Sequence, residues 1–169
     1  MLKLSFITEQ GRQNPLEARA AGIAAFFDKE SKKISDRTER ARSLAIGVDT
    51  NGAVKRRQQQ ILHLEQRQIE LNHARAFVLG VLSNTPQASE TPSVGYYFVE
   101  KLNEIDLEIE RIQSYPRGVI IELGVVKGKR QELEHLSTIR ADMLRVGNHV
   151  LGLLGEPPLV DEKNPAANS

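Results

Sequence analysis

The chain contains no cysteine and no tryptophan, and aromatic residues make up only 5% of its 169 positions. Without cysteine there are no disulfides, no thiol catalysis and no cysteine-ligated zinc, which fits a reducing compartment. Large rings usually supply much of the buried area in a compact enzyme core. An elongated helical protein can instead be built on Leu, Ile, Val and Ala, so the composition favours that class.

The charges nearly cancel, with a net charge of +1, so no overall field favours nucleic acid or an anionic membrane. No stretch approaches the roughly 20 consecutive apolar residues that a membrane helix needs. The start, MLKLSFITEQ, is too short and too polar for a signal peptide. We therefore expect a cytoplasmic protein, or a component of a particle assembled inside the cell, with no membrane insertion.

Apolar residues recur in alternating steps of three and four over the first half of the chain, which predicts helices at 15–49 and 53–83. Asn14 followed by Pro15 is a typical helix start, and the pair Asn51–Gly52 is typical of a turn. Glu30 and Thr38 occupy two positions of the first stripe. The first predicted stripe contains Leu16, Ala20, Ile23, Phe27, Ile34, Ala41, Ala45 and Val48. The second contains Val54, Ile61, Leu64, Leu71, Ala74, Val78 and Leu82.

The second half predicts helices at 96–114 and 116–154. An interaction seam typical of coiled coils runs through Phe98, Leu102, Ile105, Ile109 and Ile112. The apolar phase continues past Pro116, so residues 96–154 are either a hairpin or one kinked rod. The β-branched run at 119–126 leaves a strand as the alternative, with LKLSF near the start as its only partner.

Together these patterns predict an all-α protein of elongated antiparallel helical hairpins, a four-helix bundle with coiled-coil character. The expected organisation is an N-terminal arm at 1–14, a helical domain at 15–155 and an extended C-terminal tail at 156–169. The tail, GEPPLVDEKNPAANS, contains three prolines and has little to bury, so we expect it to be disordered or to lie on the surface.

Two Glu-x-x-His motifs, one on each of two predicted helices, resemble those of ferritin-like di-iron bundles, which add one Glu from each of the other two helices. The resemblance covers only these short motifs. It implies a di-metal carboxylate enzyme as an alternative function. Glu30 fits that scheme because it lies in the apolar stripe, whereas Glu100 lies off the seam, so we expect no metal and no cofactor. The six residues of this alternative are Glu30, Glu70, His73, Glu100, Glu132 and His135.

Basic residues suggest a second alternative, a helical protein associated with nucleic acid. One cluster opens the second predicted helix, one lies within the fourth, and single basic residues are spread along the first, namely Lys32, Lys33, Arg37, Arg40 and Arg42. Acidic residues are interleaved with them, and no aromatic residues stand among them to stack on bases. Solvated helix faces are therefore the favoured explanation of these basic residues. The expected phosphate contacts are Lys55, Arg56, Arg57, Lys127, Lys129 and Arg130.

No nucleophile motif and no phosphate-binding loop occurs in the sequence. Long helices with one apolar stripe must bury it against a hairpin partner or another subunit. The leading hypothesis is therefore a non-enzymatic structural or adaptor subunit of a larger assembly, such as a viral particle or a secretion-type apparatus. Its expected partners are other protein subunits and further copies of itself, bound through coiled-coil faces and the terminal arms.

Overall fold

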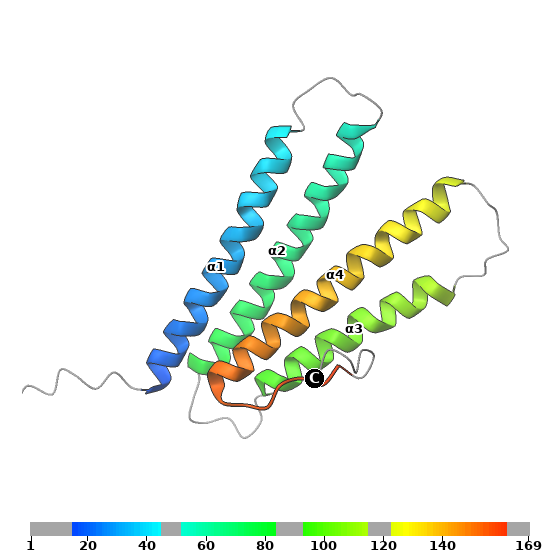
Figure 1. Cartoon of the computed structure of the whole chain (residues 1–169). Coiled ribbons are helices and arrows are strands. Elements are labelled where there is room, and N and C mark those ends of the chain that lie inside the picture. The colour runs from blue at the N-terminus through cyan, green and yellow to red at the C-terminus, as the bar shows by residue number, and fades with distance from the viewer. Residues whose placement is uncertain (1–14, 45–51, 84–92, 115–122, 162–169) are drawn as a thin grey trace, which may run out of the picture.

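The computed structural model describes residues 15–44, 52–83, 93–114 and 123–161. These form four α-helices and no strand (Figure 1). The predicted all-α class is confirmed. The helices are α1 (Pro15–Leu44), α2 (Ala53–Ser83), α3 (Val94–Ser114) and α4 (Leu123–Leu154).

The helices form two antiparallel hairpins, α1 with α2 and α3 with α4. Between the hairpins, α4 packs on both α1 and α2, and α3 packs on α2. Figure 1 shows the hairpins converging where α2 ends and α3 begins, and diverging toward their tips. We call these the closed end and the open end. Because α3 and α4 run antiparallel, the hairpin prediction for the second half is confirmed and the kinked rod is wrong.

All four helices contribute to one apolar core at the closed end. Phe27 of α1, Val78 of α2, Phe98 of α3 and Val150 of α4 have no exposed surface. A second cluster lies between α3 and α4 alone and contains Leu102, Ile105, Ile139 and Met143. Most described residues of the stripes predicted for α1 and α2 are buried, namely Ile23, Phe27, Ile34, Ala41, Leu64, Leu71, Ala74 and Val78, and Glu30 and Thr38 are buried within the first stripe. Ala20, Val54, Ile61 and Leu82 are only half-buried.

The interaction seam of α3 requires a correction. Phe98, Leu102, Ile105 and Ile112 are buried, and Ile109 is half-buried against the α3–α4 cluster. A buried stripe has already lost its contact with water inside this chain, so it offers no apolar area to a partner. The seam is therefore intramolecular, and any partner surface lies elsewhere.

Local hydrogen bonds fix two helix ends. The Tyr96 amide donates to Ser93 Oγ at 3.1 Å, an N-cap that starts α3 two residues before the predicted boundary. Gly155 adopts φ +79°, and the Glu156 amide donates to the Leu151 carbonyl at 2.9 Å. This Schellman arrangement ends α4 and turns the chain back along the molecule.

The last described residues, 156–161, are held against the second hairpin, and we call them the C-terminal segment. The Leu159 amide donates to Asn148 Oδ1 at 2.6 Å, and Leu159 packs on both apolar clusters. Arg140 pairs with Asp106 at 2.8 Å and with buried Asp161 at 2.9 Å. Within this segment Leu159 is half-buried and Asp161 is buried, and the other residues are exposed.

Several predicted parts lie outside the described residues: 45–49 and 116–122 of the predicted helices, the N-terminal arm at 1–14 with its LKLSF stretch, and the tail from 162 to 169. Residues 123–126 are helical, against the alternative of a strand there. Within α4, Ile139, Met143, Val146, Val150 and Leu151 are buried, whereas Leu153 is exposed.

Candidate functional site

The structure does not bring the six residues of the di-metal alternative together. His73, Glu100 and Glu132 are exposed, and Glu100 accepts a hydrogen bond from the Tyr96 hydroxyl at 2.6 Å. Glu70 pairs with Lys101 at 3.0 Å. Among the described residues, no three acidic or histidine side chains are close enough to hold one metal ion.

Glu30 and His135, the two buried members of that set, have other partners. Glu30 pairs with Lys33 and with Arg145 of α4, each at 2.6 Å. Burial acts to raise the pKa of Glu30, but the hydrogen bonds from Lys33 and Arg145 outweigh it and hold this pKa below its ordinary value. Glu30 is therefore a carboxylate that links α1 to α4.

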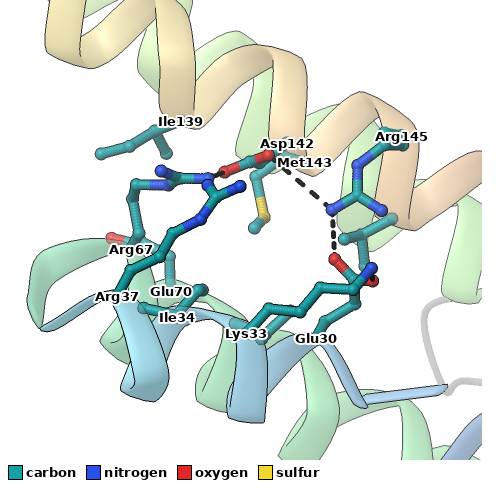
Figure 2. Close-up of a pocket in the computed structure, with 12 residues that line it drawn as sticks. Glu30, Lys33, Ile34, Arg37, Arg67, Glu70, Ile139, Asp142, Met143 and Arg145 are labelled. Atoms are coloured by element: carbon teal, nitrogen blue, oxygen red, sulfur yellow. Dashed lines mark hydrogen bonds and ion pairs between the residues drawn. The ribbon is translucent and has the colours of Figure 1, made fainter. Parts of the chain in front are cut away.

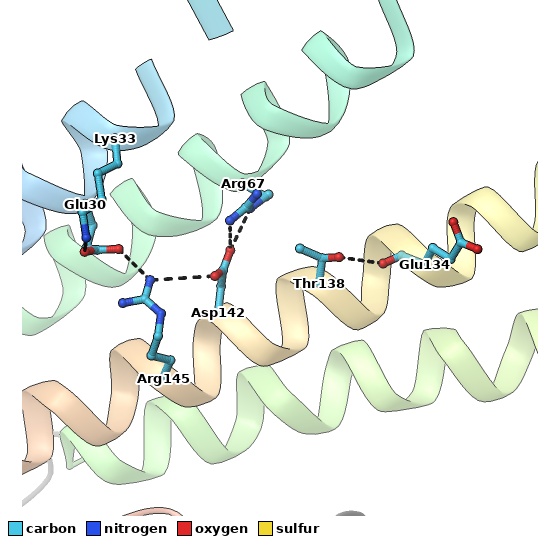
Figure 3. Close-up of polar contacts among 7 residues, drawn as sticks. All are labelled: Glu30, Lys33, Arg67, Glu134, Thr138, Asp142 and Arg145. Carbon is cyan, nitrogen blue, oxygen red and sulfur yellow. Dashed lines mark hydrogen bonds and ion pairs between the residues drawn. The ribbon is translucent and has the colours of Figure 1, made fainter. Parts of the chain in front are cut away.

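Such ion pairs form a layer between the hairpins, next to the apolar core (Figure 3). Arg67 of α2 pairs with Asp142 of α4 at 2.5 Å, and Arg145 lies 3.8 Å from the same carboxylate. Figure 2 shows this layer around a cavity of about 340 Å³, which Arg37 and Met143 also line. The charged residues that line this cavity form ion pairs, with one exception. Arg37 makes no hydrogen bond or ion pair in the described part of the chain.

The predicted phosphate contacts divide between the two tips of the open end. Lys55 and Arg56 are exposed on α2, where Arg57 donates to the Leu44 carbonyl. On α4, Arg130 is exposed and pairs with Glu134 at 3.0 Å. Lys129 is half-buried, and the side chain of Lys127 is outside the described residues. The two clusters thus lie on different hairpins, near the first turns of α2 and α4 at the open end (Figure 1).

A second feature is the outer face of α3, which carries apolar side chains opposite to its buried seam. Tyr96, Val99 and Leu107 are exposed, and Leu107 has 66% of its surface free. Their spacing, with Asn103 between, follows one stripe of a helix. The helix therefore has a second apolar face that nothing in the described chain covers fully.

The C-terminal segment borders this stripe and forms a groove of about 620 Å³ with it. Pro157, Pro158 and Val160 line one wall, and Tyr96 and Val99 line the other. Val160 is 72% exposed. The hydrogen bonds of Arg140 to Asp161 and then Asp106 raise the pKa of its guanidinium, which therefore remains a cation between the segment and the helix. We call α3 residues 96–107 and the C-terminal segment together the α3 face.

Acidic residues surround the α3 face. Helix α3 contains five acidic residues and two basic ones, a net charge of −3. Both basic residues form ion pairs, Lys101 with Glu70 and Glu104, and Arg111 with Glu108. Exposed Glu100, Glu104 and Glu110 therefore give the rim of the face a negative potential.

Sequence reasoning missed this face and the ion pairs that hold its edge. It assigned the apolar residues of α3 to one seam, although Tyr96, Val99 and Leu107 repeat at helical spacing on the other side. That repeat was the available signal. The pairing of Arg140 with Asp161 had no signal, because it depends on the return of the chain after Gly155.

No helix in the described residues has both the length and the apolar character required to cross a membrane. The chain matches no family model, no curated protein and no solved structure with which it was compared. Its function is therefore argued from its own geometry.

Proposed function

We propose that this protein is a non-enzymatic structural or adaptor subunit of a larger assembly, and that it binds protein partners through the α3 face. The observation that supports this most directly is the exposed apolar stripe of Tyr96, Val99 and Leu107 beside the C-terminal segment. Contiguous apolar area that stays exposed, with a polar rim, is typical of protein-binding surfaces. The kind of assembly, a viral particle or a secretion-type apparatus, is part of the proposal.

The face is well suited to binding because its two walls are already fixed. The Arg140 ion pairs and the hydrogen bond from Leu159 to Asn148 hold the segment on the second hairpin. A partner that enters the groove then orders little of this chain, which reduces the entropic cost of association. The partner expected from the chemistry is a helix whose apolar residues are flanked by basic ones.

A second copy of this chain offers such a helix on α2. Leu62 and Ile69 are exposed there, and Lys55, Arg56 and Arg57 lie in the preceding turns. The open-end part of the first hairpin, residues 36–44 and 53–67, contains seven basic and three acidic residues, a net charge of +4. Its basic character complements α3, so we take a second copy as the occupant of the α3 face.

The first test is light scattering of purified protein over a range of concentrations. We expect self-association that weakens at least tenfold in the double variant Val99→Asp with Leu107→Asp, and also in Leu62→Asp. The matched control adds two charges to exposed α1 positions, Ala21→Asp with Ala25→Asp, and should associate like the wild type.

The second test is capture of partners from the native source with wild type and the α3-face double variant as baits. The proposal requires the double variant to lose assembly components that the α1 control retains. The proposal would be overturned by two results together: wild-type protein that stays a monomer at every concentration, and the same set of captured proteins with the wild type and the α3-face double variant. The α3 face would then bind nothing.

A further inference from the structure

A second opening between the hairpins lies toward the open end, beside the ion-pair layer. It is a cleft of about 650 Å³ between α2 and α4, and Arg37 of α1 reaches it as well. Three arginines, two histidines and three glutamines line it, while Leu64 is its one apolar residue. The principal groups are Arg37, Arg56, Gln59, His63, Arg67 and His135. Such a lining excludes an apolar ligand and favours a charged one.

Positive charge exceeds negative charge in this cleft. Its one carboxylate is Glu134, which pairs with Arg130 at 3.0 Å. Arg67 is balanced by Asp142. Arg37 makes no ion pair or hydrogen bond with any described residue, and Figure 2 shows its guanidinium extending toward Arg67 and Asp142. Two guanidinium groups that lie close together, one of them without a carboxylate partner, make a favourable position for a bound anion.

A pair of histidines lies deeper in the cleft. The rings of His63 on α2 and His135 on α4 stack at 3.9 Å with an interplanar angle of 10°, and Gln66 lies 3.1 Å from His135 Nε2. Burial, then the charges of His63 and Arg67, lowers the pKa of His135 to about 4. The groups that face this ring are thus cationic or neutral, apart from the paired Glu134.

From this cluster we propose that the inter-hairpin cleft binds a phosphoryl-bearing anion with two or more negative charges. Arginine is suited to this ligand because its planar fork donates two parallel hydrogen bonds to phosphate oxygens. The amides of Gln59, Gln60 and Gln131 add donors and acceptors for the remainder of the ligand. The inference does not rest on the α3 face, which lies on the other side of the second hairpin's seam.

A bound anion would touch both hairpins. Arg37 and Arg56 belong to the first hairpin, and His135 and Thr138 belong to the second. The anion would therefore tie the two arms together at the end where the apolar core is absent, and it would raise the melting temperature through mass action.

Two sources could supply this chemistry, a small polyphosphate compound or the backbone of a nucleic acid. Pyrophosphate and a short single-stranded oligonucleotide are the probes, each titrated by calorimetry into the full chain at low ionic strength. Lys55 is exposed on α2 and does not line the cleft, so Lys55→Gln should weaken only the oligonucleotide. If Lys55→Gln changes the affinities for pyrophosphate and the oligonucleotide equally, the ligand is a small polyphosphate compound and not an extended nucleic-acid strand.

The decisive variant is Arg37→Gln, because it removes a guanidinium that makes no ion pair with the residues described by the structure. We expect pyrophosphate binding to fall by about 10- to 100-fold, the effect of losing hydrogen bonds to a charged group. Arg40→Gln is the matched control. It removes the same charge from the same helix, three residues further on, at an exposed position outside the cleft.

The ring of His135 gives a second readout that a purely structural role of Arg37 would not change. An anion in the cleft favours the charged imidazole, so the pKa of His135 followed by NMR should rise when pyrophosphate is added. This rise should be absent in Arg37→Gln and retained in Arg40→Gln. If neither probe binds, or if both variants weaken binding equally, the cleft is no anion site and the proposal is wrong.

Discussion

The closed and open ends of this molecule are built from the same four helices but use different interactions. At the closed end, Phe27, Val78, Phe98 and Val150 are completely buried, and each such side chain contributes about 1.5–3 kcal/mol. Toward the open end the hairpins meet through ion pairs, then through stacked His63 and His135, and then diverge. Stability is therefore concentrated at one end, and polar surface is left available at the other.

The largest effect should come from removing a ring at the closed end. Phe98→Ala leaves a cavity among side chains of all four helices, and we expect a loss of about 3–5 kcal/mol in the free energy of unfolding. Chemical denaturation followed by circular dichroism measures it.

Leu62→Ala is the comparison for that variant, because Leu62 is 62% exposed on α2. It should change the free energy of unfolding by no more than about 0.5 kcal/mol. Equal losses in the two variants would mean that the core is not concentrated at the closed end.

Acidification should weaken the region where the arms separate. His135 has a pKa of about 4 in the folded protein and about 6.5 when unfolded, so protons bind preferentially to the unfolded chain. Its contribution to stability is complete above pH 6.5, falls as the pH drops to about 4, and changes no further below that. The loss amounts to at most about 3 kcal/mol.

Comparison of wild type with His135→Gln separates this effect from the titration of carboxylates. The variant should lose less stability than the wild type between pH 6.5 and 4. His73→Gln, at an exposed position, should keep the wild-type pH dependence. Parallel curves for wild type and His135→Gln would mean that the ring is not buried in a cationic site.

The next effect tests how closely the closed end is packed. A Cβ added at Gly147 would lie 2.9 Å from Phe98 Cγ and 2.8 Å from Leu159 Cδ1, so Gly147→Ala should destabilise the protein by about 1–2 kcal/mol. Gly152 is on the same helix with nothing within 4 Å, and Gly152→Ala should stabilise by up to about 1 kcal/mol. Thermal melts of the pair distinguish the two sites by the sign of the change.

The smallest effects are expected among the ion pairs. Arg145→Gln leaves Lys33 as the one remaining partner of buried Glu30 among the described residues. Because Arg145 is itself exposed, the free energy of unfolding should fall by only about 1 kcal/mol. Arg130→Gln removes a fully solvated pair with Glu134 at the open end and should cost no more than about 0.5 kcal/mol. Denaturation at low and high salt should show that salt reduces both losses, and that at high salt only the first variant keeps a measurable loss, because Glu30 is buried.

Much of this fold could be predicted from the sequence because helical periodicity is a local property. Most of the described stripe residues of α1 and α2, together with Glu30 and Thr38, are buried where the spacing places them, and the others are half-buried. The seam of α3 was also located correctly, but we expected it to bind other subunits, whereas α4 of the same chain covers it. Spacing shows that a stripe must be buried and does not show which helix covers it.

The candidate sites were less predictable because they combine residues that are distant in the sequence. His63 and His135 stack although 72 positions separate them in the numbering. The two basic clusters were identified, whereas Arg37, which pairs with no described residue, did not differ by spacing from its neighbours on α1. The role that we propose for it depends on the divergence of the hairpins, which is a tertiary property.

Amide hydrogen exchange of the free protein tests the contrast between the two ends most directly. The account predicts that protection along α2 rises from the open end at residues 53–62 to the closed end at 71–82, and that α4 shows the same gradient from 128–135 to 143–151. Uniform protection along both helices would contradict it, because the two hairpins would then be held together equally along their whole length.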